Sequence, residues 1–261
     1  MRGKYAYVES NPENLLDPMG LWFLRQHNDI TISAFNSLMK KNKSCRCKYT
    51  SSNIVDIRQG LEVGCINPDT LSSSYGGRRT GRKEFDRSHY GENLFWHAMR
   101  YQENSAQELR DKVSERIGSY MIFGRNRKRD FYLKGLTIGE GLHTFEDTFN
   151  EAHVIRSGNL ISWFQEYEYQ DKVKHFMSDI NVFQPGYIQS INHVYNLLDM
   201  VLCRESSDQE IINYVDSMMQ LTPDAKYTGT HEKFAKTYGE HNYYEPYDGT
   251  IFYDQGGMLL N

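Results

Sequence analysis

The stretch GLHTFEDTFNEAHVIR, residues 141–156, decides how this sequence is interpreted. It closes a pattern over residues 129–150 in which apolar side chains recur at three- and four-residue spacing, and that pattern predicts a helix. His143 and Asp147 are four residues apart, so on a helix they share one face and can direct a nitrogen and an oxygen at the same ion. One such pair alone is more often a solvated surface pair than a pair of metal ligands. His153, six residues further on, adds a third donor.

A second pair with the same spacing lies downstream. His175 and Asp179 occur in KHFMSDI, within a predicted helix over residues 159–182. Two antiparallel helices that each carry such a pair can direct four ligands into one cleft. Two pairs together with His153 therefore favour a metal site over two unrelated surface pairs.

Three further candidates lie upstream. Asp69 follows a proline in CINPD, at the start of a long Gly- and Ser-rich connection over residues 64–88. His89 stands at the far end of this connection, and His27 lies near the start of the first predicted helix. Taken singly, each is more often a capping or structural residue. As a set, they predict a site that several segments share.

The rest of the chain predicts an all-α, multi-helix domain. Strand-like alternation is scarce, and residues 222–261 form a Tyr-rich, irregular tail, so we expect the domain to span residues 22–221. Helical periodicity occurs in seven segments, residues 29–42, 89–103, 106–117, 129–150, 159–182, 188–203 and 208–220.

Composition narrows the class of protein. The chain has 261 residues and a formal net charge of −4, which argues weakly against a dedicated nucleic-acid binder. Mean hydropathy is −0.69, and no apolar stretch is long enough to predict a transmembrane helix or a secretory signal. The four cysteines are too few to predict a disulfide framework, and they form no zinc-knuckle pattern.

The N-terminal segment resembles a known family. Tyr5, Tyr7, Asn11-Pro12 and the run from Asp17 to Leu21 closely match the close of an Rhs repeat core. In that family the core is a β-strand shell around a variable C-terminal toxin, which is released by cleavage after the last Leu of an Asp-Pro-x-Gly-Leu motif. The resemblance implies that residues 1–21 are a core remnant and that cleavage falls between Leu21 and Trp22. It also implies a secreted antibacterial effector, of the kind delivered by type VI secretion, with a cognate immunity protein.

The candidate ligands resemble a second family, the zinc-dependent phospholipases C and the related single-strand nucleases. Its signature of His, three residues, Asp, five residues, His fits His143, Asp147 and His153. Members begin, after processing, with a Trp whose amino and carbonyl groups bind zinc, followed closely by a His. An Rhs cut would make Trp22 such a first residue, with His27 five positions on. This sequence departs from the family pattern at two points. The interval from Asp69 to His89 is long, so that Asp86 competes as the carboxylate ligand, and Ala152 stands where the family often has Pro.

The resemblance implies up to three Zn²⁺ ions and a phosphodiesterase. A hydroxide bridging two zinc ions would attack phosphorus, and Asp69 is the residue we expect to act as general base. Five histidines argue against magnesium. The first ion would be held by Asp69, His89, His143 and Asp147, the second by Trp22, His27 and Asp147, and the third by His153, His175 and Asp179.

Three functions remain open at this point. The first is a phospholipase C acting on membrane phospholipids at the membrane surface or in the periplasm of a target bacterium; the aromatic tail could contact lipid or an immunity protein. The second is a nuclease toxin acting on single-stranded DNA or RNA, supported by basic runs at 76–83 and 124–129. The third, a non-catalytic binding or pore-forming toxin with structural histidines, has little support because no segment suits pore formation.

Overall fold

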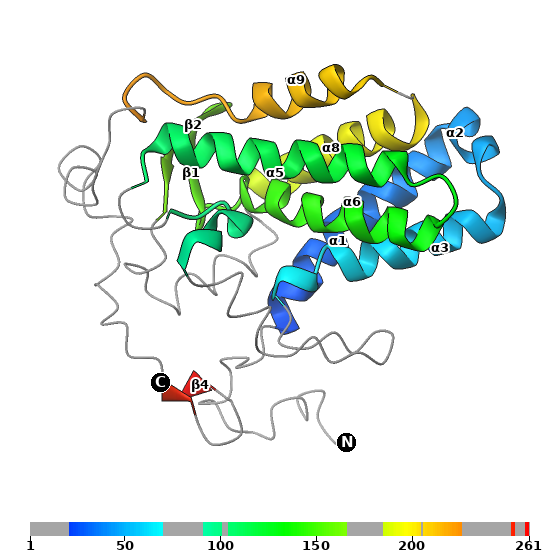
Figure 1. Cartoon of the computed structure of the whole chain (residues 1–261), viewed down its shortest axis with the longest axis horizontal. Helices are drawn as coiled ribbons and strands as arrows, with labels where there is room; N and C mark the ends of the chain where they lie inside the picture. Colours follow the sequence, from blue (N-terminus) through cyan, green and yellow to red (C-terminus); the bar gives the residue numbers. More distant parts are fainter. Residues whose placement is uncertain are drawn as a thin grey trace.

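The structure is a computed structural model, and it describes residues 21–69, 91–100, 104–165, 185–204 and 206–225, plus two short strands near the C-terminus. Of residues 21–25, 91–93 and 185 it describes the backbone only. The described part is mostly helical, in agreement with the all-α class (Figure 1). No helix in these ranges is both long enough and apolar enough to cross a membrane.

The elements follow one another in this order along the chain. The N-terminal half contains α1 (Leu21–Lys41), α2 (Lys43–Lys48), α3 (Ser51–Gly64), the 3₁₀ helices η3 (Asn67–Asp69) and η4 (Gly91–His97), and α5 (Ala106–Asn126). The second half contains α6 (Phe131–Asp147), β1 (Val154–Ser157), β2 (Leu160–Phe164), α8 (Pro185–Leu198), the π-helical turn η6 (Asp199–Cys203), α9 (Asp208–Met218), β3 (Phe252–Tyr253) and β4 (Leu259–Leu260).

Short-range capping fixes where several helices begin. Ser105 with Glu108 and Ser207 with Glu210 form capping boxes at the starts of α5 and α9. Thr50 and Asp130 accept backbone N–H groups at the starts of α3 and α6. For this reason the predicted starts at residues 106 and 208 are confirmed, and the predicted start of α6 differs by two residues.

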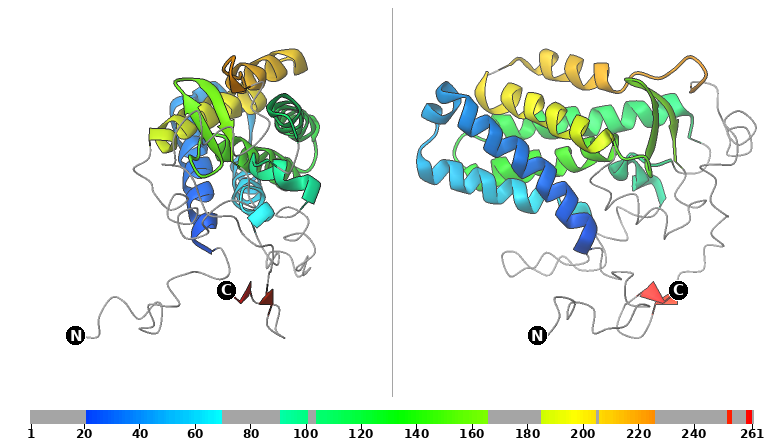
Figure 2. Two further views of the ribbon diagram at one scale, coloured as in Figure 1. Left: turned by 90° about the vertical axis from the view of Figure 1, so that its left-hand side faces the viewer. Right: turned by 180° about the vertical axis from the view of Figure 1, so that it is seen from behind.

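Helix α6 is central because glycines let its backbone approach two neighbours (Figure 2). On its α3 side, Gly135 and Gly139 face Gly60 and Gly64 of α3. A Cβ atom on Gly64 would lie 2.2 Å from the Leu136 carbonyl oxygen, so the two backbones are in direct contact. On its other side, α6 packs on α5. This arrangement holds the end of α3 against the last turns of α6.

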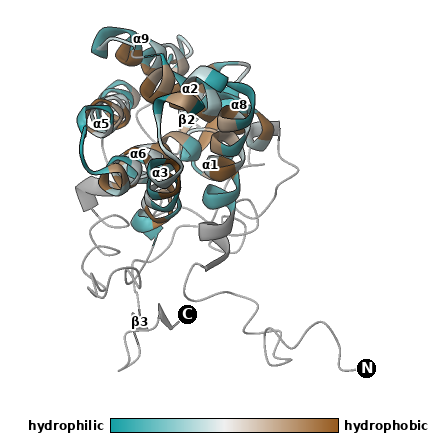
Figure 3. Cartoon of the chain, turned by 90° about the vertical axis from the view of Figure 1, so that its right-hand side faces the viewer, coloured by the Kyte–Doolittle hydropathy of each residue, from teal (hydrophilic) through white to brown (hydrophobic). Residues whose placement is uncertain are grey.

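The core lies between these helices and a second layer formed by α1, α8 and α9. Helix α1 packs against α8, and α9 against α5. Figure 3 shows the apolar sides of the helices turned toward one another. Each buried aliphatic or aromatic side chain contributes about 1.5–3 kcal/mol to stability. Fully buried members include Phe35, Leu38, Ile57, Leu61, Ile117, Met121, Ile138 and Leu142.

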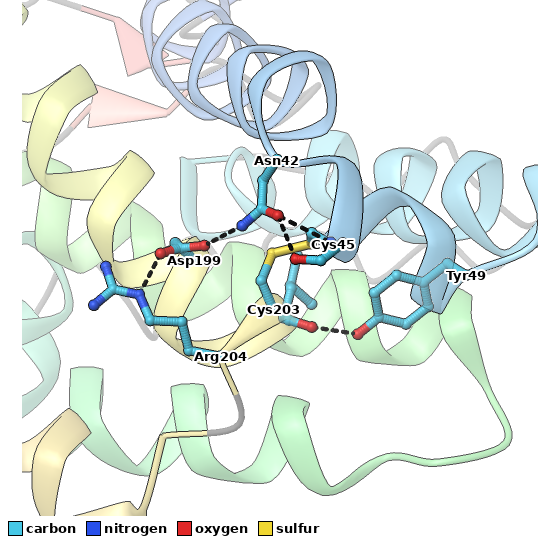
Figure 4. The surroundings of a disulfide bond; sticks show 8 residues. Asn42, Cys45, Tyr49, Asp199, Cys203 and Arg204 are labelled. Atoms are coloured by element: carbon cyan, nitrogen blue, oxygen red, sulfur yellow. Dashed lines mark hydrogen bonds and ion pairs between the residues drawn. A yellow bond between two sulfur atoms is a disulfide. The ribbon is translucent and has the colours of Figure 1, made fainter.

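A disulfide joins Cys45 of α2 to Cys203 of η6 (Figure 4). Around it, the Asn42 side-chain amide donates to Asp199 (Nδ2 to Oδ1, 3.0 Å), which also accepts from Arg204, and the Tyr49 hydroxyl donates to the Leu202 carbonyl (2.9 Å). The cysteine pattern did not predict this cross-link, because its two residues are 158 positions apart and no motif connects them.

The helix predicted over residues 159–182 is wrong at its start. Ser157 pairs with Leu160, and Gly158 at φ +61° forms the tight turn of a β1–β2 hairpin. Periodicity cannot distinguish a short buried strand from a helix in the apolar run LISWF. The rest of that segment, residues 166–182, lies outside the described residues.

Other boundaries also differ from the predictions. Helices α2 and α3 were not predicted, and the segment predicted as helix 89–103 contains the 3₁₀ helix η4 within its described part. The first residues of the predicted tail continue the fold, since Thr222 donates its N–H to the Ile161 carbonyl (2.8 Å) and Ala225 is buried. Most of residues 226–261 lie outside the described part, so the division at residue 221 stays a prediction.

Candidate metal centre

Five segments bring histidines and carboxylates together at the C-terminal end of α6. Helix α1 contributes His27, η3 contributes Asp69 and η4 contributes His97. His143 and Asp147 come from the last turns of α6, and His153 follows from the turn before β1. We call these six residues the His–Asp cluster; all but the half-buried His27 are buried.

Asp147 occupies the middle of the cluster. Its Oδ1 lies 3.2 Å from Nε2 of His27, and its Oδ2 lies 3.2 Å from Nε2 of His143 and 3.3 Å from Nδ1 of His97. The i, i+4 spacing of His143 and Asp147 thus brings their side chains together as the sequence predicts. Both oxygens of Asp147 thus face imidazole nitrogens, which come from α1, η4 and α6.

The tautomer of His143 follows from its backbone partner. Its Nδ1 donates to the Cys65 carbonyl (2.8 Å), just beyond the end of α3. Nε2 is therefore the nitrogen that faces the cluster, and it lies 3.0 Å from Nδ1 of His97 and 3.7 Å from Oδ1 of Asp69. The close α3–α6 contact is what places this carbonyl within reach.

Asp69 and His153 lie at the edges of the cluster. Asp69 reaches His97 (Oδ1 to Nδ1, 3.5 Å) and His27 (Oδ2 to Nε2, 3.9 Å). His153 donates from Nδ1 to the His97 carbonyl (2.6 Å), and this same Nδ1 lies 3.8 Å from Asp147. A metal on His153 would therefore be bound through Nε2.

A scaffold of polar contacts holds η4, and with it His97, against α6. The Arg116 guanidinium lies between the rings of Trp96 and Tyr120, 4.1 and 4.4 Å from their centroids, and Nε donates to Thr144 (2.9 Å). Thr144 in turn donates to the Trp96 carbonyl (2.7 Å). Ala98, directly after His97, has φ +50°, a left-handed conformation that costs an L-residue about 1 kcal/mol.

The donor atoms fit a metal ion. Among the described residues, two triads have ligand atoms that all lie within 4.8 Å of one another: His27, Asp69 and His143, and His97, His143 and Asp147. Imidazole nitrogens and carboxylate oxygens are both ligands that proteins use for metal ions. The residues of the cluster can therefore hold a metal ion.

The electrostatics of the cluster also favour a cation. Burial lowers the pKa of His27, but Asp147 and Glu146 outweigh it and raise that pKa well above the usual value. Burial raises the pKa of Asp147, but His153, His143 and His27 outweigh it and hold that pKa well below the usual value. The carboxylates thus stabilise positive charge at this position, whether a proton on imidazole or a metal ion carries it.

No family model, curated protein or solved structure matches this chain. The two resemblances therefore rest on motifs, and the function is argued from the geometry of the His–Asp cluster. Apart from the His143–Asp147 pair, that geometry does not follow from the spacing that suggested the families, because five segments have to meet in space to produce it.

The structure brings together five of the predicted ligands, His27, Asp69, His143 and Asp147, with His153 beside them, and their role as metal ligands stays a prediction. Trp22 lies in the first turn of α1, five residues before His27, and its side chain is not described. Three predicted ligands, His89, His175 and Asp179, and the competing Asp86 lie outside the described residues.

Two residues of this region were missed from the sequence. His97 occupies the position beside Asp69 and His143 that we expected His89 to take, and its only signal was a histidine within the segment predicted as helix 89–103. Glu146 contacts His27, and nothing in its spacing distinguished it from a surface glutamate.

Proposed function

We propose that this chain is a zinc-dependent phosphodiesterase that hydrolyses membrane phospholipids in the manner of a phospholipase C. One observation carries the proposal: imidazoles and carboxylates from α1, η3, η4 and α6 converge in two triads that share His143, and within each triad the ligand atoms lie within 4.8 Å of one another. Burying so many ionisable groups is costly unless they are paired or hold a cation. A site of this kind therefore points to function rather than to stability.

The residues have distinct roles in this proposal. His27, His97, His143 and Asp147 would hold the ions, and Asp147 faces two sides at once. Zinc supplies Lewis acidity, which lowers the pKa of water and stabilises negative charge that develops on phosphoryl oxygens. Asp69 is 8% exposed and Asp147 only 1%, so Asp69 is the carboxylate that water reaches more easily. It is therefore the residue to orient the attacking water and accept its proton.

Two observations favour lipid over nucleic acid. The basic run at 124–129 joins α5 to the start of α6, and His143 lies about 18 Å further along that helix axis. This run is thus poorly placed to guide a polynucleotide into the His–Asp cluster. The Cys45–Cys203 disulfide suits an oxidising compartment such as the periplasm, where phospholipid is at hand. The basic run at 76–83 lies outside the described residues.

Delivery follows from the N-terminal motif. The Rhs-like residues 1–21 support an antibacterial toxin that a secretion system exports, that an Rhs shell encloses, and that an immunity protein neutralises. Cleavage after Leu21 would give Trp22 a free amino group, which lies at the start of the helix that carries His27. Comparing zinc content in chains 1–261 and 22–261 tests this part, and equal content would remove the Trp22 amino group from the site.

The main test is activity on two substrates in parallel. Chain 22–261 is assayed on phospholipid vesicles and on single-stranded DNA and RNA, with and without a chelator. Zinc-dependent release of diacylglycerol is the expected result. His143→Ala should lower that rate by about a thousandfold or more, because a charge-stabilising group at the reaction centre is lost. His193→Ala, the same change at a histidine outside the cluster, is the matched control.

The other outcomes assign the site differently. Release of nucleotides would show that the chain is a nuclease. Activity on neither substrate, together with loss of helical structure on chelation, would show that the metal is structural and would overturn the proposal.

A further inference from the structure

Glu146 is a buried carboxylate that the proposed chemistry does not use. It lies next to Asp147 on α6, but adjacent residues on a helix point about 100° apart, so Glu146 faces α1 while Asp147 faces the cluster. Its Oε2 accepts from Nδ1 of His27 at 2.6 Å, and its Oε1 accepts from the Thr31 hydroxyl at 2.5 Å. Both oxygens of the carboxylate are thus held by one face of α1.

The two partners on α1 form a matched pair. His27 and Thr31 are four residues apart, so they lie on the same side of the helix. Thr31 is fully buried, and its hydroxyl fixes the orientation of the carboxylate from the side opposite the imidazole. Glu146 therefore cannot swing away from His27 without breaking a second buried hydrogen bond.

The contact determines which nitrogen of His27 is available to a metal. A carboxylate at 2.6 Å holds the proton on Nδ1, and this leaves Nε2 as the donor atom. Nε2 is the nitrogen that faces Asp147 at 3.2 Å and Asp69 at 3.9 Å. Glu146 thus contacts the His27 ring on the side that faces away from the cluster, and it orients Nε2 toward the other candidate ligands.

His27 differs in this respect from two other histidines of the cluster. His143 and His153 donate from Nδ1 to main-chain carbonyls, which side-chain substitution does not remove. His27 donates to a carboxyl side chain, and such a partner makes the imidazole a stronger donor to a cation. The ion at the α1 edge of the cluster is therefore the one whose binding depends on a side chain outside the ligand set.

We propose that Glu146, held by Thr31, is a positioning residue that orients His27 and sets the affinity of the metal ion bound at the α1 edge of the His–Asp cluster. This inference rests on the proposed zinc site and adds to it a residue that no motif assigned. It predicts that substitution of Glu146 lowers the affinity for one ion of the site and leaves the affinity for ions held by the other histidines unchanged.

The test is a zinc titration of the full chain by competition with a chelator of known affinity. Glu146→Gln should weaken one ion by about 10–100-fold and leave the remaining zinc content unchanged. Thr31→Val, which removes only the hydroxyl, should weaken the same ion by a smaller factor. Glu115→Gln makes the same chemical change at an exposed position of α5 and should have no effect on zinc affinity.

A second measurement separates positioning from general damage. In ¹⁵N-histidine spectra of the zinc-loaded wild type, His27 should carry its proton on Nδ1 and bind through Nε2. Wild-type zinc affinity in Glu146→Gln, or a His27 bound through Nδ1, would overturn this inference and leave the proposed function standing. A wild-type chain that binds no zinc would overturn both.

Discussion

The two ends of helix α6 make different kinds of contact. At its start, Lys134 donates to two of the last carbonyls of α5, and Tyr49, directly after α2, contacts Phe131. The Cys45–Cys203 disulfide joins α2 to η6 beside Tyr49 (Figure 4). At its end, His143, Glu146 and Asp147 are buried among other ionisable groups. The start of α6 lies beside a disulfide and a helix end whose carbonyls are hydrogen-bonded, and both stabilise the fold. The end of α6 carries buried ionisable groups, which cost free energy unless they are paired or hold a cation.

The difference shows that the stabilising contacts and the His–Asp cluster lie at separate ends of one helix. The disulfide restricts the unfolded chain at a point remote from the cluster, since His27 and the end of α1 are about 21 Å apart along the helix. Stability supplied there can offset the cost of burying carboxylates at the other end. The glycine contacts between α3 and α6 connect the two ends, because they extend along both helices.

The largest loss of stability is expected from a substitution at the α3–α6 backbone contact, which connects the two ends of α6. In Gly64→Ala the new Cβ would lie 2.2 Å from the Leu136 carbonyl oxygen, and backbone cannot move aside cheaply. We expect a loss of about 4 kcal/mol or more in the free energy of unfolding, together with weaker zinc binding, since the next residue accepts from His143. Urea denaturation and elemental analysis measure the two effects.

Gly118→Ala is the matched control for this change. Its Cβ would meet only a side-chain atom of Ile212, at 3.7 Å, which is ordinary contact. We expect stability to be unchanged or higher by up to about 1 kcal/mol, because alanine is the better helix former. Similar losses in both variants would show that the α3–α6 backbone contact has no special role.

The next largest loss of stability is expected from removal of the disulfide near the start of α6. Replacing Cys45 and Cys203 together by Ser removes a bond between residues 158 positions apart, and we expect a loss of about 3 kcal/mol. Zinc content and the reaction rate of the folded protein should not change. Cys47→Ser, at an exposed free cysteine, is the control. A drop in zinc affinity in the double variant would mean that the two ends are not independent.

The sequence predicts the two ends unequally, for physical reasons. Spacing on one helix locates His143 and Asp147, because periodicity links residues four apart. The pairing of Cys45 with Cys203, the arrival of His97 beside Asp69, and the contact of Glu146 with His27 join distant segments. Such contacts depend on tertiary packing, such as the approach of α3 to α6, and no local pattern encodes them.

The same reasoning explains which secondary structure was missed. The starts of α5 and α9 are local, because Ser105 and Ser207 cap them through residues three positions on. The β1–β2 hairpin depends instead on pairing across Gly158 and on burial of residues such as Trp163. An apolar run of five residues carries too little periodicity to identify it.

The smallest expected effect lies at the start of α6 and depends on pH. Burial first, then Lys48 and Arg125, lower the pKa of Lys134 from 10.5 to about 8. Between these values the unfolded chain binds more protons than the folded chain, so this lysine makes the protein more stable as pH rises from about 8 to 10.5. After a discount for solvent screening, we expect a rise of about 1 kcal/mol.

The measurement is the difference in unfolding free energy between wild type and Lys134→Met at several pH values from 7.5 to 10, which cancels other titrating groups. Below about pH 8, Lys134 is charged in both the folded and the unfolded wild-type chain, so the difference in unfolding free energy should not change with pH. Above about pH 8, this difference should increase in favour of the wild type. Lys112→Met, at an exposed lysine of α5, is the matched control. If Lys134→Met gives a difference that does not change with pH, Lys134 is not desolvated at the end of α5, and only the disulfide then distinguishes the start of α6 from its end.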